Sequence, residues 1–278
     1  MNKLKAIFIT LYSMGAMFAA IHSTAMLFIS DFNNAWIGAF IATTPIAVFF
    51  SYMLTKKSTA RTSKNLPQLL VPSVIGFGLA LVSQQNSIMP LMYAASFGLI
   101  GTLLYVYWYS HINRSAANIK VGQTLPDFTL TDTQGEAVNS SAFRQQASLL
   151  LFFRGSWCPL CMAQIKEIAA SYKALELRGV KVFLVSPQSE RQSQKLAKQF
   201  DAPMTFMVDK NLKAAKQLGI MHESGTPVGM KGYDSDTVMP TAILTDKTGK
   251  IIFADLTDNY RVRPEPKTFI NILDNQPT

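Results

Sequence analysis

The chain has 278 residues, of which 49% are hydrophobic and only 15% are charged, and its formal net charge at pH 7 is +9. So small a charged fraction is unusual for a single water-soluble protein. Positive charge gathers in the first part of the chain, where Asp31 is the only acidic residue before position 115, and the second part has no basic face with interleaved aromatic residues. The basic balance therefore indicates segments beside a membrane and argues against a nucleic-acid partner.

Four apolar runs predict that residues 1–112 form an α-helical membrane region. Each run is close to the ~20 residues that a helix needs to cross a bilayer. The third run is the weakest, because it is short and contains Pro67 and Pro72, although proline is tolerated in membrane helices. The runs are 6–29, 35–54, 66–82 and 88–109. We expect about four transmembrane helices, in contact with the lipid bilayer.

Lysine and arginine predict how these helices are oriented. They occur before the first run, between the second and third runs, and after the fourth run, whereas the two opposite loops have none. Cytoplasmic loops carry such an excess. We therefore expect a multi-pass protein of the inner (plasma) membrane with its C-terminal domain in the cytoplasm; if the third run does not span, that domain lies on the other side. The residues concerned are Lys3, Lys5, Lys56, Lys57, Arg61, Lys64, Arg114 and Lys120.

Residues 121–278 follow a short polar linker at 113–120 and have the pattern of an α/β domain. Strand-like apolar runs alternate with segments of helical spacing, and a hairpin and a last helix follow. The expected strands are 148–153, 180–186, 203–208, 241–245 and 251–254, and the expected helices are 158–178, 190–200, 211–218 and 266–273. This order predicts a mixed sheet that is covered by helices on both faces.

The two cysteines of the chain, Cys158 and Cys161, fall where the first central strand turns into a helix. Unpaired N–H groups at a helix start lower the pKa of a thiol, and the spacing brings the second sulfur within reach of the first. Pro159 suits the first helical turn, where its missing N–H costs nothing. An inert buried pair and half of a zinc site are the alternatives. A zinc site needs four ligands, and only three histidines accompany the cysteines, so we expect a redox dithiol with no metal and no cofactor.

Four segments of the second half carry a resemblance to a known family. They are V-G-Q-T-L-P-D-F-T-L-T-D-T-Q-G at 121–135, F-F-R-G-S-W-C-P-L-C at 152–161, M-P-T-A-I-L-T-D-K-T-G-K-I at 239–251 and Y-R-V-R-P-E-P at 260–266. This half resembles the thioredoxin-like superfamily and, within it, the peroxiredoxin-like branch of the alkyl hydroperoxide reductase/thiol-specific antioxidant (AhpC/TSA) family. The resemblance implies a thioredoxin-like α/β fold, here fused to an N-terminal four-helix membrane region.

The resemblance also implies roles for single residues. Cys158 is similar to the nucleophilic, or peroxidatic, cysteine, and Cys161 to the resolving cysteine with which it forms a redox-active disulfide. Pro240 matches the proline that follows a cis peptide bond beside the dithiol, where the backbone of Met239 can pair with a substrate strand. Trp157 is expected either to shield the thiol or simply to cap the core.

The chain also departs from the family pattern. Peroxiredoxins proper carry a proline and a threonine where this sequence has Leu151 and Gly155, and they bind the peroxide with that threonine and an arginine. Arg154, Arg261 and Arg263 are candidates for the positive charge, and a surface location is the alternative for each. Dithiol–disulfide exchange requires fewer of these residues than peroxide reduction does.

These observations predict an oxidoreductase: a membrane-anchored thiol-disulfide oxidoreductase or a thiol-dependent peroxidase with antioxidant function. Its expected partners are a protein disulfide or a peroxide as substrate, and an external thiol reductant that is thioredoxin- or glutathione-like. The size of the membrane region leaves two alternatives. The domain is a redox-sensing or partner-binding module coupled to its membrane helices, or it regulates transport through them; the lack of buried charge in the spans argues against transport.

Overall fold

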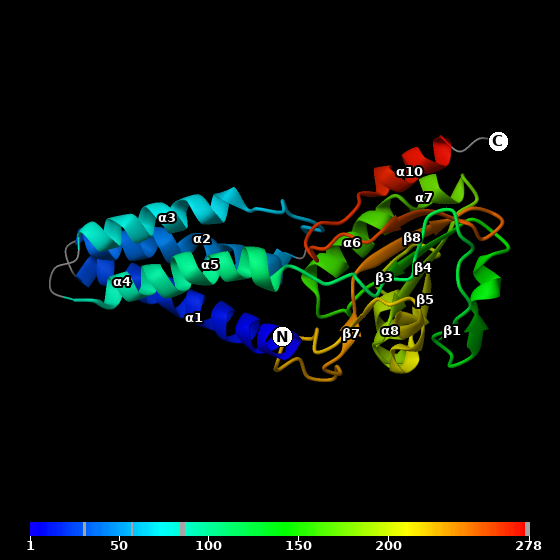
Figure 1. The fold of residues 1–278 in the computed structure, drawn as a ribbon, viewed down its shortest axis with the longest axis horizontal. Coiled ribbons are helices and arrows are strands. Elements are labelled where there is room, and N and C mark those ends of the chain that lie inside the picture. Colours follow the sequence, from blue (N-terminus) through cyan, green and yellow to red (C-terminus); the bar gives the residue numbers. More distant parts are fainter. Residues whose placement is uncertain (30–31, 57, 84–86, 276–278) are drawn as a thin grey trace.

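The computed structural model describes residues 1–29, 32–56, 58–83 and 87–275. A bundle of helices is joined end to end with an α/β domain, and the N-terminus lies where the two parts meet (Figure 1). This arrangement confirms the predicted fold class. Asp31 and Lys57, which entered the charge argument, lie outside the described residues.

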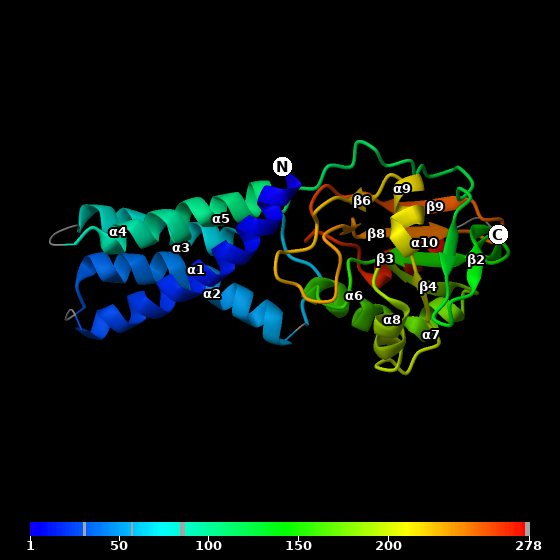
Figure 2. The same cartoon turned by 90° about the horizontal axis from the view of Figure 1, so that it is seen from below.

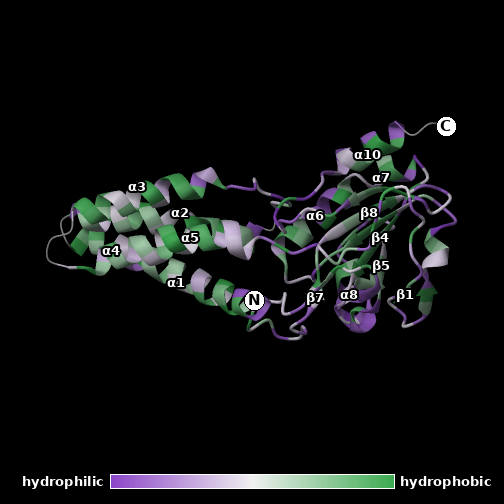
Figure 3. Cartoon of the chain, in the orientation of Figure 1, coloured by the Kyte–Doolittle hydropathy of each residue, from purple (hydrophilic) through white to green (hydrophobic). Residues whose placement is uncertain are grey.

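The apolar runs form the helices of the bundle. Their bounds are α1 Asn2–Ile29, α2 Asn34–Lys56, α3 Pro67–Val82, and a last run that consists of α4 Met89–Tyr93, η1 Ala94–Ile100, α5 Gly101–Leu103 and η2 Leu104–Tyr109, where η1 and η2 are π-helical. Among the described helices, α1, α2 and the run Met89–Tyr109 are long and apolar enough to cross a membrane, whereas α3 has only 16 residues. The helices of the bundle consist largely of apolar residues (Figure 3), and many of their large apolar side chains are exposed, which suits contact with lipid.

Glycine lets α2 and α3 approach closely. A Cβ atom added at Gly38 would lie 2.6 Å from the carbonyl oxygen of Gly76, and one added at Gly76 would lie 2.5 Å from the carbonyl oxygen of Gly38. Small residues at such crossings are the usual means by which membrane helices pack together. The pair therefore sets the position of α2, which also reaches the C-terminal domain.

The domain is built on a seven-stranded sheet with the strand order β2-β1-β5-β4-β3-β8-β9. The central strand β3 pairs in parallel with β4 and antiparallel with β8, as expected for a mixed sheet. A separate pair, β6 with β7, was not predicted. The bounds are β1 Thr129–Thr131, β2 Ala137–Asn139, β3 Ser148–Phe152, β4 Lys181–Ser186, β5 Thr205–Val208, β6 Met221–His222, β7 Thr237–Val238, β8 Thr241–Thr245 and β9 Ile251–Asp255.

Helices cover both faces of this sheet, as predicted. Figures 1 and 2 show α6, α7 and α10 on one face and α8 and α9 on the other. The bounds are η3 Ser140–Phe143, α6 Pro159–Ala170, α7 Tyr172–Glu176, α8 Glu190–Ala197, η4 Lys210–Leu212, α9 Lys213–Gln217 and α10 Pro266–Asp274.

The prediction of one helix over 158–178 is wrong. The helix is broken at Ser171, whose backbone lies outside the helical region at φ −99° and ψ 5°.

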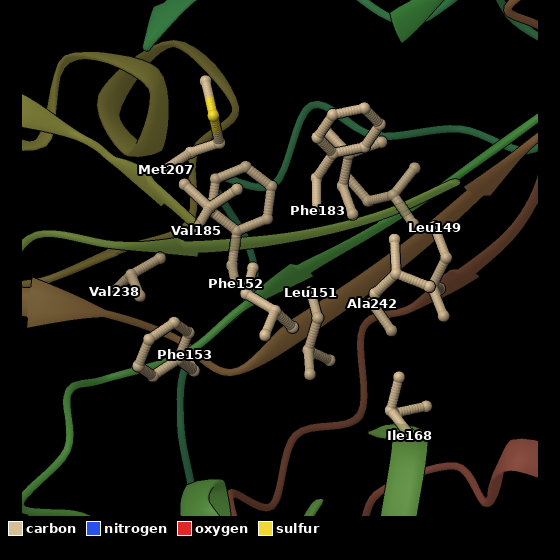
Figure 4. Packing of buried hydrophobic residues seen from close by; sticks show 14 of the residues in the cluster. Leu149, Leu151, Phe152, Phe153, Ile168, Phe183, Val185, Met207, Val238 and Ala242 are labelled. Carbon is tan, nitrogen blue, oxygen red and sulfur yellow. The ribbon is translucent and has the colours of Figure 1, made fainter. Parts of the chain in front are cut away.

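The core lies around β3, whose five residues are all buried. Leu149, Leu151 and Phe152 pack among side chains from the neighbouring strands and from α6 (Figure 4). Because β3 is covered on both faces, it reads in sequence as a continuous apolar run rather than an alternating one. This rigid strand ends just before the cysteine-bearing turn and so fixes the position of that turn.

The bundle and the domain are held together by the loop between α2 and α3. Arg61 forms an ion pair with Glu167 on α6 and donates through Nε to the carbonyl oxygen of Arg263 over 3.1 Å. Arg261 donates to the Thr62 hydroxyl over 2.6 Å and to the carbonyl oxygens of Ser63 and Lys64. The segment predicted as a linker, 113–120, also lies against the domain, where Ile119 is buried in the core.

Candidate active site

A tight turn places the two cysteines at the start of α6, at the end of the domain that faces the bundle (Figure 2). Gly155 makes this turn possible at φ +143°, and a Cβ atom there would lie 2.9 Å from the ring of Trp157. Cys158 is the N-cap of α6 and Pro159 is its first residue. The predicted strand–turn–helix unit, with Pro159 in the first helical turn, is confirmed.

The two sulfur atoms are 2.7 Å apart and share a hydrogen bond. Both cysteines are free thiols in this structure, and both are buried, with 2% of Cys158 and none of Cys161 exposed. The two sulfur atoms are therefore close enough to exchange a proton or to form a disulfide.

Arg263, in the segment before α10, brings positive charge to both sulfur atoms. Its Nη1 and Nη2 atoms lie 3.4 Å and 3.5 Å from Sγ of Cys161, and Nη2 lies 3.9 Å from Sγ of Cys158. Nη1 also donates to the side-chain oxygen of Gln164 over 3.0 Å, and Nε donates to the carbonyl oxygen of Tyr260 over 3.0 Å. These contacts hold the guanidinium rigidly against the thiols.

The surroundings shift the pKa values of the two thiols in opposite directions. Burial disfavours either thiolate. At Cys161 burial is outweighed by the hydrogen bond from Cys158 and by the charge of Arg263, which lower the pKa of Cys161 to about 5. Burial, together with the hydrogen bond and the negative charge of Cys161, raises the pKa of Cys158 well above its ordinary value. The helix-start argument for a lowered pKa at Cys158 is thus wrong, because burial and the neighbouring Cys161 raise that pKa.

Arg154 is a second buried cation beside the pair. Its Nη2 donates to the carbonyl oxygen of Gly225, and its guanidinium carbon lies 4.7 Å from the ring centre of Trp157 and 5.4 Å from that of Tyr260. Its Nε atom is buried and has no hydrogen-bond partner among the described residues. A surface location, the alternative for this arginine, does not apply, since only 4% of Arg154 is exposed.

Two residues expected at the site, Arg261 and Pro240, differ from what was expected of them. Arg261 is fully buried, but its guanidinium binds Ser110 and the loop between α2 and α3, so Arg263 and not Arg261 faces the thiols. The described residues contain no cis peptide bond, so the expectation of a cis bond before Pro240 is wrong. The backbone N–H of Met239 is already paired with the carbonyl oxygen of Ile220, and the carbonyl oxygen of Pro240 accepts from Arg114.

A cavity of about 380 Å³ adjoins the thiols. Trp157 and Cys158 line it from the domain, and side chains of α1 and α2 line it from the bundle. Of the two cysteines, only Cys158 reaches its wall. A small molecule in the cavity can therefore reach Cys158, whereas Cys161 lies behind it.

Sequence reasoning missed Gln164 and Arg114. Gln164 lies one helical turn after Cys161, so the helical period alone could have placed it on the same face of α6. Arg114 was seen only as a charge beside the membrane, and no local pattern indicates its contact with Pro240.

Comparison with known proteins gives a consistent result for this half of the chain. Residues 121–254 match the model of the AhpC/TSA family. Peroxiredoxin Q from Sedum lineare is 29% identical over 154 residues, which cover 55% of this chain and 76% of the relative. The thiol-disulfide oxidoreductase ResA of Bacillus cereus is 24% identical over 156 residues, covering 56% and 78%. Peroxiredoxin Bcp of Escherichia coli is 27% identical over 145 residues, covering 51% and 90%.

Solved structures that are similar to this chain include two peroxiredoxins. Peroxidoxin BcpB from Mycobacterium tuberculosis superimposes with a TM-score of 0.47 and 18% identity, covering 58% of this chain and 100% of its own. Reduced Prx3 from Vibrio vulnificus in complex with hydrogen peroxide gives a TM-score of 0.49 and 19% identity, covering 56% and 99%.

Proposed function

We propose that the protein, whose residues 121–254 match the model of the AhpC/TSA family, is a thiol-dependent peroxidase anchored in a membrane by its N-terminal helices. Cys158 is the nucleophile and Cys161 resolves it. The observation that carries this proposal is the buried sulfur pair with the guanidinium of Arg263 across both atoms. A cation in that position stabilises a thiolate, which is the reactive form.

Burial of the pair favours a peroxide over a protein disulfide. Only 2% of Cys158 is exposed, which leaves little surface for a folded protein to approach. In thioredoxin-like proteins a substrate strand can pair with the backbone beside the proline that corresponds to Pro240. Here the backbone groups on either side are already hydrogen-bonded, to Ile220 and to Arg114. A peroxide needs only to reach one sulfur through the adjoining cavity.

The reaction follows from the protonation state of the pair. We take Cys161 as the thiolate, because its pKa is lowered, and Cys158 as the thiol, whose sulfur lies 2.7 Å away. As Sγ of Cys158 attacks the terminal oxygen of a hydroperoxide, its proton passes to Cys161. The O–O bond breaks, Cys158 becomes a sulfenic acid, and the leaving alkoxide recovers the proton from Cys161 and departs as an alcohol.

Resolution then restores the pair. The Cys161 thiolate attacks Sγ of the sulfenic acid, an S–S bond forms, and the hydroxide released takes up a proton as water. Two thiols of an external thioredoxin- or glutathione-like reductant reduce the disulfide and are themselves oxidised to a disulfide. With α3 crossing the bilayer alongside the three longer runs, the lysine and arginine distribution supports placing the domain in the cytoplasm, where such reductants are abundant.

The test uses the full chain in phospholipid nanodiscs with a dithiol reductant. We expect Cys158→Ser to abolish peroxide consumption. Cys161→Ser should stop at the sulfenic acid, which a dimedone-type reagent traps on Cys158 and mass spectrometry identifies. Full turnover by the Cys158→Ser protein would show that the nucleophile lies elsewhere and would end the proposal.

A further inference from the structure

The cavity beside Cys158 is built jointly by the membrane helices and the thiol-bearing turn. Its volume of about 380 Å³ falls in the range of ~300–1,000 Å³ that is usual for small-molecule sites. The bundle contributes mostly apolar side chains, among them Ile9, Phe49, Phe50, Met53 and Leu54. Hydrogen peroxide is small and polar, so contact with this apolar wall would not stabilise its binding.

Hydrogen-bonding capacity is concentrated at the thiol end of the cavity. Nε of Arg154 and Nε1 of Trp157 are buried donors with no partner among the described residues, and both residues line the cavity. The hydroxyls that α1 contributes are already used: Thr10 donates to the carbonyl oxygen of Val228 over 3.0 Å and Ser13 to that of Thr10 over 3.1 Å. A fitting ligand therefore has an oxygen-bearing group near Cys158 and a hydrocarbon part toward the bundle.

Exposed apolar side chains surround the cavity where the helices end. Leu54 on α2 is 54% exposed, and Val228 and Met230 from the domain are 53% and 38% exposed. The loop that carries them lies against the first turns of α1, since the N–H of Val228 donates to the carbonyl oxygen of Ala6 over 3.3 Å. Apolar side chains grouped at the end of membrane-spanning helices favour contact with the lipid interface. These side chains give the cavity an exposed apolar rim that suits contact with a bilayer.

We propose that this cavity binds the acyl chain of a lipid hydroperoxide that enters from the bilayer, with its hydroperoxy group at Cys158. The inference rests on the proposed peroxidase function and names its substrate class. Sγ of Cys158 bonds to the terminal peroxide oxygen, the O–O bond breaks, and the lipid leaves as an alcohol. Arg154 and Trp157 donate hydrogen bonds to the oxygens, and α1 and α2 hold the chain, so the membrane helices form part of the substrate site.

The test compares two oxidants of the reduced full chain in phospholipid nanodiscs. One is a phospholipid hydroperoxide within the disc and the other is hydrogen peroxide in the buffer; disulfide formation is followed by thiol alkylation. Ile9→Trp places an indole in the cavity, and Leu11→Trp is the matched control on the same helix, since Leu11 is 65% exposed and does not line the cavity. We expect the ratio of the lipid rate to the hydrogen peroxide rate to fall at least tenfold in Ile9→Trp, because ~10-fold discrimination per methylene is typical of apolar pockets.

Met53→Trp provides the same test from α2 if Ile9→Trp does not fold. An unchanged ratio in a folded cavity variant, or an equal fall in Leu11→Trp, overturns the assignment of the cavity. The same discs without peroxide test a prenyl quinone as the oxidant. If the quinone oxidises the dithiol rapidly and the cavity variants slow this reaction, the cavity binds a quinone and the lipid hydroperoxide proposal is overturned. If neither peroxide oxidises the dithiol, the proposed peroxidase function itself fails; reaction with hydrogen peroxide alone rejects only the lipid substrate.

Discussion

Replacing Arg263 by methionine removes the guanidinium that contacts both sulfur atoms and keeps a side chain of comparable length. Two unit charges 3.5 Å apart interact by roughly 5 kcal/mol at an effective dielectric constant of about 20. Desolvation of the cation offsets part of this energy, and a neighbouring opposite charge typically shifts a pKa by about 1–3 units. The pKa of Cys161, lowered to about 5 in the native protein, should therefore rise by about 2 units in Arg263→Met.

A shift of that size has a large effect on the amount of thiolate. At pH 6 a rise of about 2 units lowers the thiolate fraction about tenfold. The assay is the ultraviolet absorbance of thiolate in the reduced protein as a function of pH. Brief alkylation at each pH, followed by mass spectrometry, assigns the titration to Cys158 or Cys161.

Two further variants separate charge from packing. Arg263→Lys keeps the charge but loses the planar fork, so its midpoint should lie between those of the native protein and Arg263→Met. Arg178→Met removes an arginine that is paired with Asp274 at the surface, and its midpoint should not move. A midpoint displaced by less than about half a unit in a folded Arg263→Met protein would refute the assignment of the cation to Arg263.

Two other predictions concern pH and sidedness. Because the folded pKa of Cys161 is about 5 against an ordinary 9.0, its ionisation stabilises the reduced fold most fully near pH 9, and this contribution is lost as the pH falls toward 5. The melting temperature of the reduced protein relative to the oxidised protein should rise between pH 5 and pH 8, and no such rise should remain in Cys161→Ser; a flat difference in the native protein would contradict the shifted pKa. Val121 is 62% exposed on the domain, so a cysteine placed there in a protein without the native cysteines reports on which side of the membrane the domain lies. Val121→Cys should resist a membrane-impermeant maleimide in intact cells and react with it after permeabilisation. Labelling of intact cells would place the domain on the opposite side.

Local sequence patterns were sufficient to predict much of the fold. The apolar run of β3, the glycine of the turn and the proline at the start of α6 are neighbours in the sequence, so their geometry follows from backbone preferences and hydrophobic spacing. The break at Ser171 is different. No glycine or proline marks it, and the apolar spacing continues into α7, where Tyr172 and Leu175 are buried.

The charge environment of the thiols could not be read locally. Arg263 is 102 residues from Cys161 in the sequence, and Arg261 stands two positions away in the same motif. Arg263 faces the sulfur atoms because Arg261 is held elsewhere by its own hydrogen bonds. Arg261 is drawn to the carbonyl oxygens of the loop between α2 and α3, a contact between two parts of the chain that no periodicity encodes. The lowered pKa of Cys161 then depends on its hydrogen bond with Cys158 and on the charge of Arg263, neither of which the helix start alone predicts.

The same loop bears on why the helical bundle is larger than a simple anchor. A simple anchor requires one spanning helix and no contact with the catalytic groups. Here Arg61 pairs with Glu167 on α6, the helix that begins at the dithiol, and donates to the backbone of Arg263. The backbone of Arg263 is thus held by the loop between α2 and α3, while α1 and α2 complete the cavity at Cys158. Removing the helices would leave Arg261 without its loop partners and Cys158 without one wall of its cavity, so the helices are as much a part of the thiol site as the sheet that carries it.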